Sequence, residues 1–273
     1  MTTTDGPKSS AREDLERRLR GRRPGSALKF IGPFSPLLLL VVWEAASRGG
    51  LLDARFFPPP TSIAGTFWEL LTTGTLLEHS LITLTRVGIG IVLGGVPGLV
   101  LGIAFGAVQW LRVLAGPIFA SLLPIPKIAI LPLLLLIFGV EETSKYVIVA
   151  IGVFFYIFYN TMGGVLQTPP IYFDVARTSG ASRWRTWSTV ALPAALPSIF
   201  TGLKLAVGGA FVVIAASEFL GSRTGVGYMI WSAWQTLAVS KMFVGIVTIS
   251  LLGYLAGLLV ALVERRLVPW SRQ

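Results

Sequence analysis

Cysteine is absent from the 273-residue chain, and histidine occurs only once. The lack of cysteine excludes disulfide frameworks, thiolate metal sites, iron–sulfur clusters and cysteine nucleophiles. The single histidine, His79, cannot form a multi-histidine metal site. Because His79 directly precedes an apolar run, we interpret it as an interfacial residue without a catalytic part.

Charged residues are also scarce, at 13% of the chain against roughly 25% in soluble domains. Hydrophobic residues make up 53%, and the mean hydropathy is +0.73. Several long apolar runs account for this balance and indicate a polytopic membrane protein. The net charge of +10 does not indicate a nucleic-acid partner, because the cations gather at the ends of apolar runs, as membrane topology requires.

Six apolar segments follow a polar N-terminus, at residues 34–46, 81–108, 113–138, 146–165, 190–217 and 242–263. A membrane-spanning helix needs roughly 20 mostly apolar residues, and the last five segments satisfy this requirement. The first segment contains Glu44 and reaches that length only when flanking residues are counted. The sequence therefore predicts an all-α polytopic membrane protein with six transmembrane helices.

The distribution of lysine and arginine predicts the orientation. Fifteen of these 23 residues lie in the N-terminal arm, the connections at 109–112 and 168–189, and the tail from 264, whereas five lie in the other connections. This bias predicts an N-in, C-in topology.

The predicted organisation is a basic cytoplasmic arm at 1–29, a first span and periplasmic segment at 30–80, a transmembrane core at 81–265 and a cytoplasmic tail at 266–273. The arm has no apolar face to bury, so we interpret it as disordered or lying on the surface.

Two connections on the periplasmic side carry structural signals of their own. The proline-rich residues 57–61 predict an extended segment, followed by a short helix through Leu71 that Thr61 or Ser62 caps. Residues 221–227 are interpreted as a flexible loop. An aromatic helix at 228–237, suited to the membrane interface, is expected to follow it.

The connection at 168–189 predicts two short helices joined by a glycine, and we call it the elbow. Pro169 and Pro170 can begin the first helix. The backbone N–H that proline lacks would have no hydrogen-bond partner in the first turn of a helix. Gly180 supplies the left-handed residue that ends this helix near Ser179. Ser182 can cap the second helix, which carries the basic and aromatic residues Arg183, Trp184, Arg185 and Trp187. Leu192-Pro193 is expected to break that helix.

The spacing within the elbow resembles the cytoplasmic loop of ABC importer permeases. That loop has the pattern E-A-A, three residues, G, nine residues, I, one residue, L-P. The corresponding residues here are Asp174-Val175-Ala176, Gly180, Val190 and Leu192-Pro193, at the same spacing throughout. The departures are Asp for Glu, Val for the first Ala and Val for Ile, all chemically mild.

Further stretches resemble one branch of that family. Residues 124–133, with Phe138-Gly139 and Glu141-Glu142 after them, are similar to the third-span signature of permeases that import nitrate, aliphatic sulfonates, taurine and related compounds. Residues 57–61, 84–86, 217–218 and 225–228 also resemble this branch, and the likeness covers roughly residues 55–265. The resemblance implies the type I ABC importer permease fold in the bacterial cytoplasmic (inner) membrane.

The resemblance also implies that the chain performs no chemistry and works within a larger assembly. Two ATPase subunits would bind below two permease halves, which are expected to be identical, and a periplasmic or lipid-anchored binding protein would deliver the solute. The sequence has no G-x-x-x-x-G-K-[ST] phosphate loop, so ATP and magnesium would be bound by the ATPase and no cofactor is expected here. The residues implied in coupling to the ATPase are Asp174, Val175, Ala176, Gly180, Arg183, Arg185, Leu192 and Pro193.

Four charged residues in or at the ends of the spans are candidates for the solute path. Arg86, Lys127 and Lys204 would lower the barrier for an anion. Arg86 can instead snorkel from the end of its span, and Lys127, which lies between prolines, can instead bind freed carbonyls. Glu218 either shapes an outer gate or is a solvated helix end.

Two groups of residues are assigned to helix packing. The glycines of the second span recur at roughly helical spacing and predict close contact with a neighbouring helix: Gly88, Gly90, Gly94, Gly95, Gly98 and Gly102. The aromatic residues Phe154, Phe155, Tyr156, Phe158 and Tyr159 are interpreted as a surface within the bundle or facing lipid, and not as a ligand cage.

An ion-coupled secondary transporter is the main alternative function. Such proteins usually need intramembrane carboxylates, and the middle of the last five predicted spans contains none. A membrane-embedded enzyme would need clustered His, Asp or Glu, or a nucleophile with its base, and the sequence offers neither.

Overall fold

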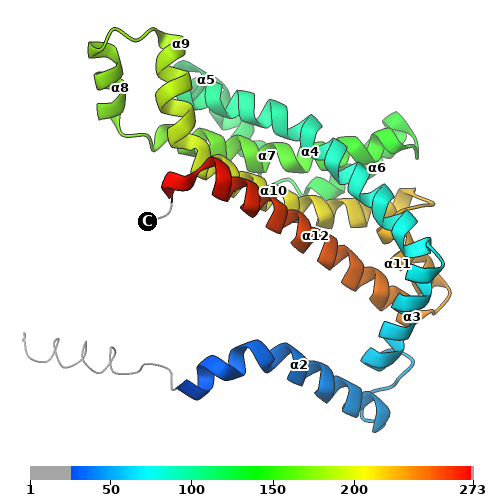
Figure 1. Ribbon diagram of the computed structural model, residues 1–273. Helices are drawn as coiled ribbons and strands as arrows, with labels where there is room; N and C mark the ends of the chain where they lie inside the picture. The colour runs from blue at the N-terminus through cyan, green and yellow to red at the C-terminus, as the bar shows by residue number, and fades with distance from the viewer. Residues whose placement is uncertain (1–25, 272–273) are drawn as a thin grey trace, which may run out of the picture. The chain divides into compact units, whose positions relative to one another are not determined.

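The computed structural model describes residues 26–271, which contain helices and no strand (Figure 1). The elements are α2 (Ser26–Arg48), α3 (Pro60–Thr72), α4 (Thr75–Ala107), α5 (Gln109–Leu122), η1 (Lys127–Ile130), α6 (Leu131–Phe138), α7 (Glu142–Leu166), α8 (Pro170–Thr178), α9 (Arg183–Thr186), η2 (Trp187–Ala191), α10 (Leu192–Gly221), α11 (Val226–Gln235), α12 (Val239–Leu267) and η3 (Pro269–Ser271). The predicted all-α class is confirmed for this range. Most of the predicted arm at 1–29 lies outside the described residues. The chain divides into two units, one through Ser62 and one from Ile63.

Helices α4, α7 and α10 form the centre of the larger unit and run side by side (Figure 1). Together with α6 they enclose one apolar cluster, in which Val87, Leu131, Ile148 and Ile214 are buried. Lipid tails are as apolar as leucine, so helices in a membrane are held together mainly by close packing and by polar contacts. The positions of small residues therefore decide how near these helices lie.

A stripe of glycines on α4 allows α7 to approach closely. Gly90, Gly94, Gly98 and Gly102 recur at every fourth residue and all face α7. A Cβ atom at Gly98 would lie 2.9 Å from the carbonyl oxygen of Phe154, so the two backbones are in direct contact. The predicted packing role is confirmed for these four glycines. Gly88 instead faces open space, because its Cβ position has no neighbour within 4 Å.

Four stretches of the described residues are long and apolar enough to cross a membrane: Thr75–Ala107, Glu142–Leu166, Trp184–Gly221 and Val239–Leu267. A fifth candidate is a pair of helices joined at a bend. The first predicted span, 34–46, lies within α2 and is not among these candidates. Six spans and the N-in, C-in orientation therefore stay predictions.

The third predicted span, 113–138, is broken. Helix α5 ends at Leu122, and a bend of 84° leads through η1 into α6. Pro124 and Pro126 lie at the bend, where each proline removes a backbone hydrogen bond and crowds the preceding turn. The segment counted as one transmembrane helix is therefore two helices joined at a bend, and the break leaves backbone carbonyls free within an apolar segment, as the prolines around Lys127 indicate.

A second apolar cluster joins the start of α4 to α11 and α12. Leu76, Met229 and Val244 are buried in it, and side chains of α3 pack at its edge. The aromatic helix predicted at 228–237 is confirmed as α11, and the short helix predicted through Leu71 is confirmed as α3.

Within the N-terminal unit, Glu44 makes contacts that its apolar neighbours in the sequence did not indicate. Its carboxylate accepts hydrogen bonds from the Arg48 guanidinium at 2.5 Å and from the Thr61 N–H and hydroxyl at 3.1 and 2.8 Å. Because Glu44 lies in the last turns of α2 and Thr61 in the first turn of α3, these bonds fix the two helix ends to each other.

Candidate functional site

The first half of the elbow is α8, which begins at Pro170 as the sequence predicts. Its end is closed by two backbone hydrogen bonds of 3.0 Å, from the Ala181 N–H to the Ala176 carbonyl and from the Gly180 N–H to the Arg177 carbonyl. Gly180 has a φ of +72° and so makes the predicted left-handed turn. A Cβ at Gly180 would have no neighbour within 4 Å, so only backbone strain of roughly 1–2 kcal/mol opposes a side chain there.

The second half of the elbow begins at Ser182, whose hydroxyl accepts a hydrogen bond from the Arg185 N–H at 3.3 Å. This confirms the predicted helix cap. Helix α9 continues into η2, a π-helical turn in which the Leu192 N–H donates to the Trp187 carbonyl five residues back. The expectation that Leu192-Pro193 breaks the helix is wrong, because the wider turn accommodates the missing amide and the ring of Pro193 and α10 follows directly.

The outer surface of the elbow is apolar and exposed. Ile171, Tyr172 and Val175 on α8 are each more than half exposed, and Trp184 on α9 is 81% exposed. Phe173 lies on the other side of α8, with its ring centre 6.1 Å from that of Trp187. Neighbouring exposed apolar side chains mark a surface that meets a partner or a membrane.

The predicted coupling residues fall into two places. Those exposed on the elbow are Asp174, Val175, Gly180 and Arg185. Asp174 lies 3.9 Å from the Arg177 guanidinium, and Ala176 is half-buried. Leu192 and Pro193 lie apart from these, in the first turn of α10. The side chain of Arg183 lies outside the described residues.

Helix α4 connects the elbow end of the bundle to a second polar region. Its last residue, Ala107, lines a cavity with Phe173 and Trp187 of the elbow. Arg86 lies in the first half of the same helix, about 30 Å away at 1.5 Å per residue. This separation matches the thickness of the hydrocarbon core of a membrane.

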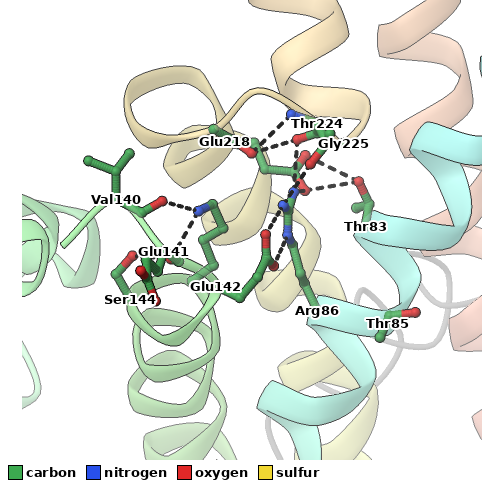
Figure 2. A network of polar contacts seen from close by, with 12 residues as sticks. Thr83, Thr85, Arg86, Val140, Glu141, Glu142, Ser144, Glu218, Thr224 and Gly225 are labelled. Carbon is green, nitrogen blue, oxygen red and sulfur yellow. Dashed lines mark hydrogen bonds and ion pairs between the residues drawn. The ribbon is translucent and has the colours of Figure 1, made fainter. Parts of the chain in front are cut away.

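Arg86 is the centre of an ion-pair network at that second region (Figure 2), and only 1% of its surface is exposed. Its guanidinium makes two bonds to Glu142 of α7, at 2.7 and 2.5 Å, and one bond to Glu218 of α10 at 2.7 Å. The two remaining N–H groups donate to the carbonyl and the hydroxyl of Thr224, at 2.8 and 2.9 Å. All five guanidinium donors are therefore used, and none is left for a solute.

Glu218 is the most enclosed member of this network and has no exposed surface. Besides Arg86, its carboxylate accepts hydrogen bonds from the Thr83 hydroxyl at 3.0 Å and from the Gly227 N–H at 2.8 Å. A Cβ at Gly225 or Gly227 would overlap the Glu218 side chain. The loop after α10 therefore wraps around the carboxylate and can do so only with glycine at both positions.

These contacts correct three expectations drawn from the sequence. Arg86 does not snorkel, because its charged end is buried between carboxylates, and Glu218 is not a solvated helix end. The loop expected to be flexible at 221–227 is tied to α4 through its amides. The Val226 N–H donates to Thr83 at 2.9 Å, and the Gly225 N–H donates to Nδ1 of His79 at 3.0 Å.

Lys127 lies at the break in the third span. Its ammonium donates hydrogen bonds to the carbonyls of Leu122, Leu123 and Ile125, at 3.2, 2.7 and 2.9 Å. The interpretation that freed carbonyls hold this cation is confirmed. The ammonium also lies 4.5 Å from the ring centre of Phe155, within the range of a cation–π contact.

Lys204 of α10 forms an ion pair with Glu264, close to the end of α12. The lysine side chain is 39% exposed and that of Glu264 is 17% exposed. Charges in apolar segments usually occur in such pairs, because each partner lowers the cost of burying the other. The sequence interpretation of Lys204 did not include this partner.

Sequence reasoning missed Glu142, Thr83 and Thr224 as partners of Arg86. A usable signal was present, because Arg86, Glu142 and Glu218 all lie near the same end of their respective predicted spans. Opposite charges at one end of neighbouring spans indicate a buried pair.

Comparison with known proteins identifies the family. Residues 98–269 match the family described as "Binding-protein-dependent transport system inner membrane component". The taurine transport system permease protein TauC of Escherichia coli is 31% identical over 93% of this chain and 94% of its own length. The riboflavin transport system permease protein RibX of Chloroflexus aurantiacus is 35% identical over 88% of this chain and 89% of its own. The nitrate import permease protein NrtB of Synechocystis sp. is 30% identical over 92% and 96%.

The matched region contains the elbow, Lys127 and two of the helices that build the Arg86 network. The relatives are transport permeases, and several helices of this chain can cross a membrane. The chain therefore belongs to the binding-protein-dependent transport system inner membrane components, the permease family of ABC importers.

Proposed function

We propose that this chain forms one half of the solute path of an ABC importer and that a separate ATPase drives it through the elbow. The observation that carries the proposal is the elbow itself, a helix–glycine–helix unit with an exposed apolar surface. The elbow connects α7 directly to α10, so a force on it would tilt both helices. Closure of the ATPase dimer would then switch the path between inward and outward access.

A second copy of the chain completes the path in this proposal, and two ATPase subunits dock on the two elbows. Both chain ends face the cytoplasm, and a periplasmic or lipid-anchored binding protein delivers the solute at the end that carries the Arg86 network. ATP and magnesium are bound by the ATPase, so this subunit needs no cofactor and is not an enzyme. The family description supports the dependence on a binding protein.

We infer that the solute is a small anion of the sulfonate, taurine or nitrate type. The names of two relatives described above, which transport taurine and nitrate, support this choice. Lys127 places a positive charge within an apolar segment, which favours an anion, whereas the charge of Lys204 is balanced by Glu264. Arg86 and Glu218 form an ion pair with each other, and their role in this proposal is to stabilise the outer end of the path.

Uptake measurements with a substituted elbow test the coupling. The host would lack its own sulfonate and nitrate importers and would express this chain with an ATPase and a binding protein. We expect Gly180→Val to reduce ATP-dependent uptake of labelled taurine, an alkanesulfonate or nitrate by about tenfold or more, because 1–2 kcal/mol of left-handed strain would reshape the docking surface. Protein levels in the membrane should stay normal.

Gly74→Val is the matched control for this experiment. Gly74 has a φ of +78°, and a Cβ there also has no neighbour within 4 Å. The substitution therefore adds similar backbone strain away from the elbow and should leave uptake near the wild-type level. Normal uptake by Gly180→Val would contradict the coupling role. Uptake that survives removal of the ATPase but collapses with the proton gradient would favour a secondary transporter.

A further inference from the structure

His79, the single histidine of the chain, binds the loop that follows α10. Its Nδ1 accepts a hydrogen bond from the Gly225 N–H at 3.0 Å. A ring nitrogen that accepts a hydrogen bond carries no proton, so the contact exists only while the imidazole is neutral, with its proton on Nε2. Histidine ordinarily has a pKa of about 6.5, so its charge changes between pH 5 and 8. This contact is therefore sensitive to pH in the physiological range.

The peptide group between Thr224 and Gly225 is held at both ends by side chains of α4. Its N–H donates to His79, and its carbonyl accepts a hydrogen bond from the Arg86 guanidinium at 2.8 Å (Figure 2). His79 and Arg86 are seven residues apart, about two turns, and so lie on the same face of the helix. Because the N–H and the carbonyl belong to one rigid plane, rotation of this peptide group would break both bonds together.

The backbone at Gly225 allows such a rotation. Gly225 has a φ of +102°, and a residue without a Cβ can change its backbone angles with little steric cost. The next residue stays in place, because the Val226 N–H donates to the Thr83 hydroxyl at 2.9 Å. A change at His79 would therefore be confined to the peptide group before Gly225 and to its bond with Arg86.

The position of His79 gives protons access to its ring. At 1.5 Å per residue, His79 lies about 40 Å from Ala107, the last residue of α4. This distance exceeds the roughly 30 Å of a membrane's hydrocarbon core. The residue is also only half-buried. The imidazole can therefore exchange protons with the aqueous phase at this end of the bundle.

Charged and titratable groups of three helices surround the ring. Glu78 precedes it on α4 and would favour a charged imidazole, whereas Arg86 of α4 and Lys241 of α12 would oppose one. Tyr228 of α11 packs at a tilt against the ring, with ring centres 6.2 Å apart, and stays uncharged below about pH 9. Because the nearby charges act in opposite directions, loss of the hydrogen bond to Gly225 is the main consequence of protonation.

We propose that His79 is a pH-sensitive switch for the loop after α10. Above about pH 6.5 the neutral ring holds the peptide group between Thr224 and Gly225. Below that pH the protonated ring becomes a donor on both nitrogens, the peptide group turns away, and Arg86 loses its bond to the Thr224 carbonyl. The stabilising effect is thus complete at neutral pH and is lost as the pH falls. The inference goes beyond the proposed function, because it concerns how one end of the bundle is closed and holds for any solute.

Nuclear magnetic resonance of the imidazole nitrogens tests the starting point directly. The full chain would be prepared with isotopically labelled histidine and a histidine-free purification tag in lipid nanodiscs, so His79 would give the only imidazole signals. At about pH 7.5 we expect Nδ1 without a proton and Nε2 with one. A protonated Nδ1 at this pH would overturn the proposal.

Hydrogen–deuterium exchange measures the response of the loop. The protection factor compares observed with intrinsic exchange and so removes the general effect of pH on exchange rates. For the peptide that contains Gly225 we expect it to fall about two- to tenfold between about pH 7.5 and 5.5, the usual worth of one hydrogen bond. The fall should have the same midpoint as the imidazole signals, and peptides from the centre of α7 should not change.

Three variants identify the group that responds to pH. His79→Asn keeps an oxygen acceptor that does not titrate, so protection should stay high at both pH values. His79→Leu removes the acceptor, so protection should be low at both. Glu78→Gln is the matched control, since it removes the neighbouring carboxylate, and it should keep the fall. Protection independent of pH in the wild type, an unchanged fall in His79→Asn, or loss of the fall in Glu78→Gln would each reject the switch.

Discussion

Replacing Glu218 by leucine is expected to destabilise the permease by about 3–5 kcal/mol, the usual cost of removing one partner from a buried ion pair. The substitution leaves Arg86, at 1% exposure, with only Glu142 to balance its charge. It also removes the acceptor of the Thr83 hydroxyl and the Gly227 N–H. Thermal unfolding of the detergent-purified protein should show a melting temperature lower by roughly 10 °C.

A double-mutant cycle separates this effect from a general loss of packing. Arg86→Leu alone should be as damaging as Glu218→Leu alone, because each leaves an unbalanced buried charge. The double variant should lose much less than the sum of the two single changes, because leucines at both positions leave no charge to compensate within the pair. Simple additivity of the two changes would contradict a coupled network. Glu69→Gln, at an exposed position of α3, should have no measurable effect.

Adding one methyl group at Gly94 is the second change with a large expected effect. In Gly94→Ala the new Cβ would lie 2.8 Å from both the Cα and the carbonyl carbon of Ala150, which are main-chain atoms and cannot rotate away. Helices α4 and α7 would have to move apart along the whole glycine stripe. We expect destabilisation of about 1–3 kcal/mol, measured as a lower melting temperature and a smaller monodisperse fraction in size-exclusion chromatography.

Gly88→Ala is the control on the same helix. A Cβ at Gly88 has no neighbour within 4 Å, and alanine favours a helix over glycine by roughly 1 kcal/mol. This variant should be as stable as the wild type or slightly more stable. If Gly88→Ala and Gly94→Ala melted at the same temperature, close contact between α4 and α7 would not explain the stripe.

The elbow could be predicted from the sequence because each of its signals is local. Pro170, Gly180 and Ser182 act on backbone groups within a few residues of themselves, and the structure places all three as expected. The glycine stripe was predictable for a similar reason, since its spacing defines one face of a single helix. Its partner could not be named, because the sequence does not state which helix lies opposite.

The Arg86 network could not be predicted in the same way. The partners of Arg86 lie 56 to 138 residues from it along the chain, and the network forms only when three helices and a loop assemble. Taken alone, an arginine near the end of an apolar run is typical of a residue that reaches the interface. The competing effect, pairing with carboxylates on other helices, depends on the order and rotation of the helices, which one sequence does not specify.

The two proline sites behave differently for another reason. Proline prevents an ordinary α-helical hydrogen bond, but it does not decide how the chain responds. At Pro124 and Pro126 the helix bends by 84°, whereas at Pro193 it continues through a wider turn. Lys127 binds the carbonyls freed at the first break, whereas at the second the π-helical turn accommodates the proline.

The π-helical turn between Trp187 and Ala191 also determines which way the elbow points. An α-helix advances about 100° for each residue, so one extra residue in a turn rotates everything beyond it by that angle. Deleting a single residue between Trp187 and Ala191 would return the segment to α-helical phase. The exposed tryptophan at 184 would then point to a different side of the bundle, although every residue of the proposed docking surface would still be present.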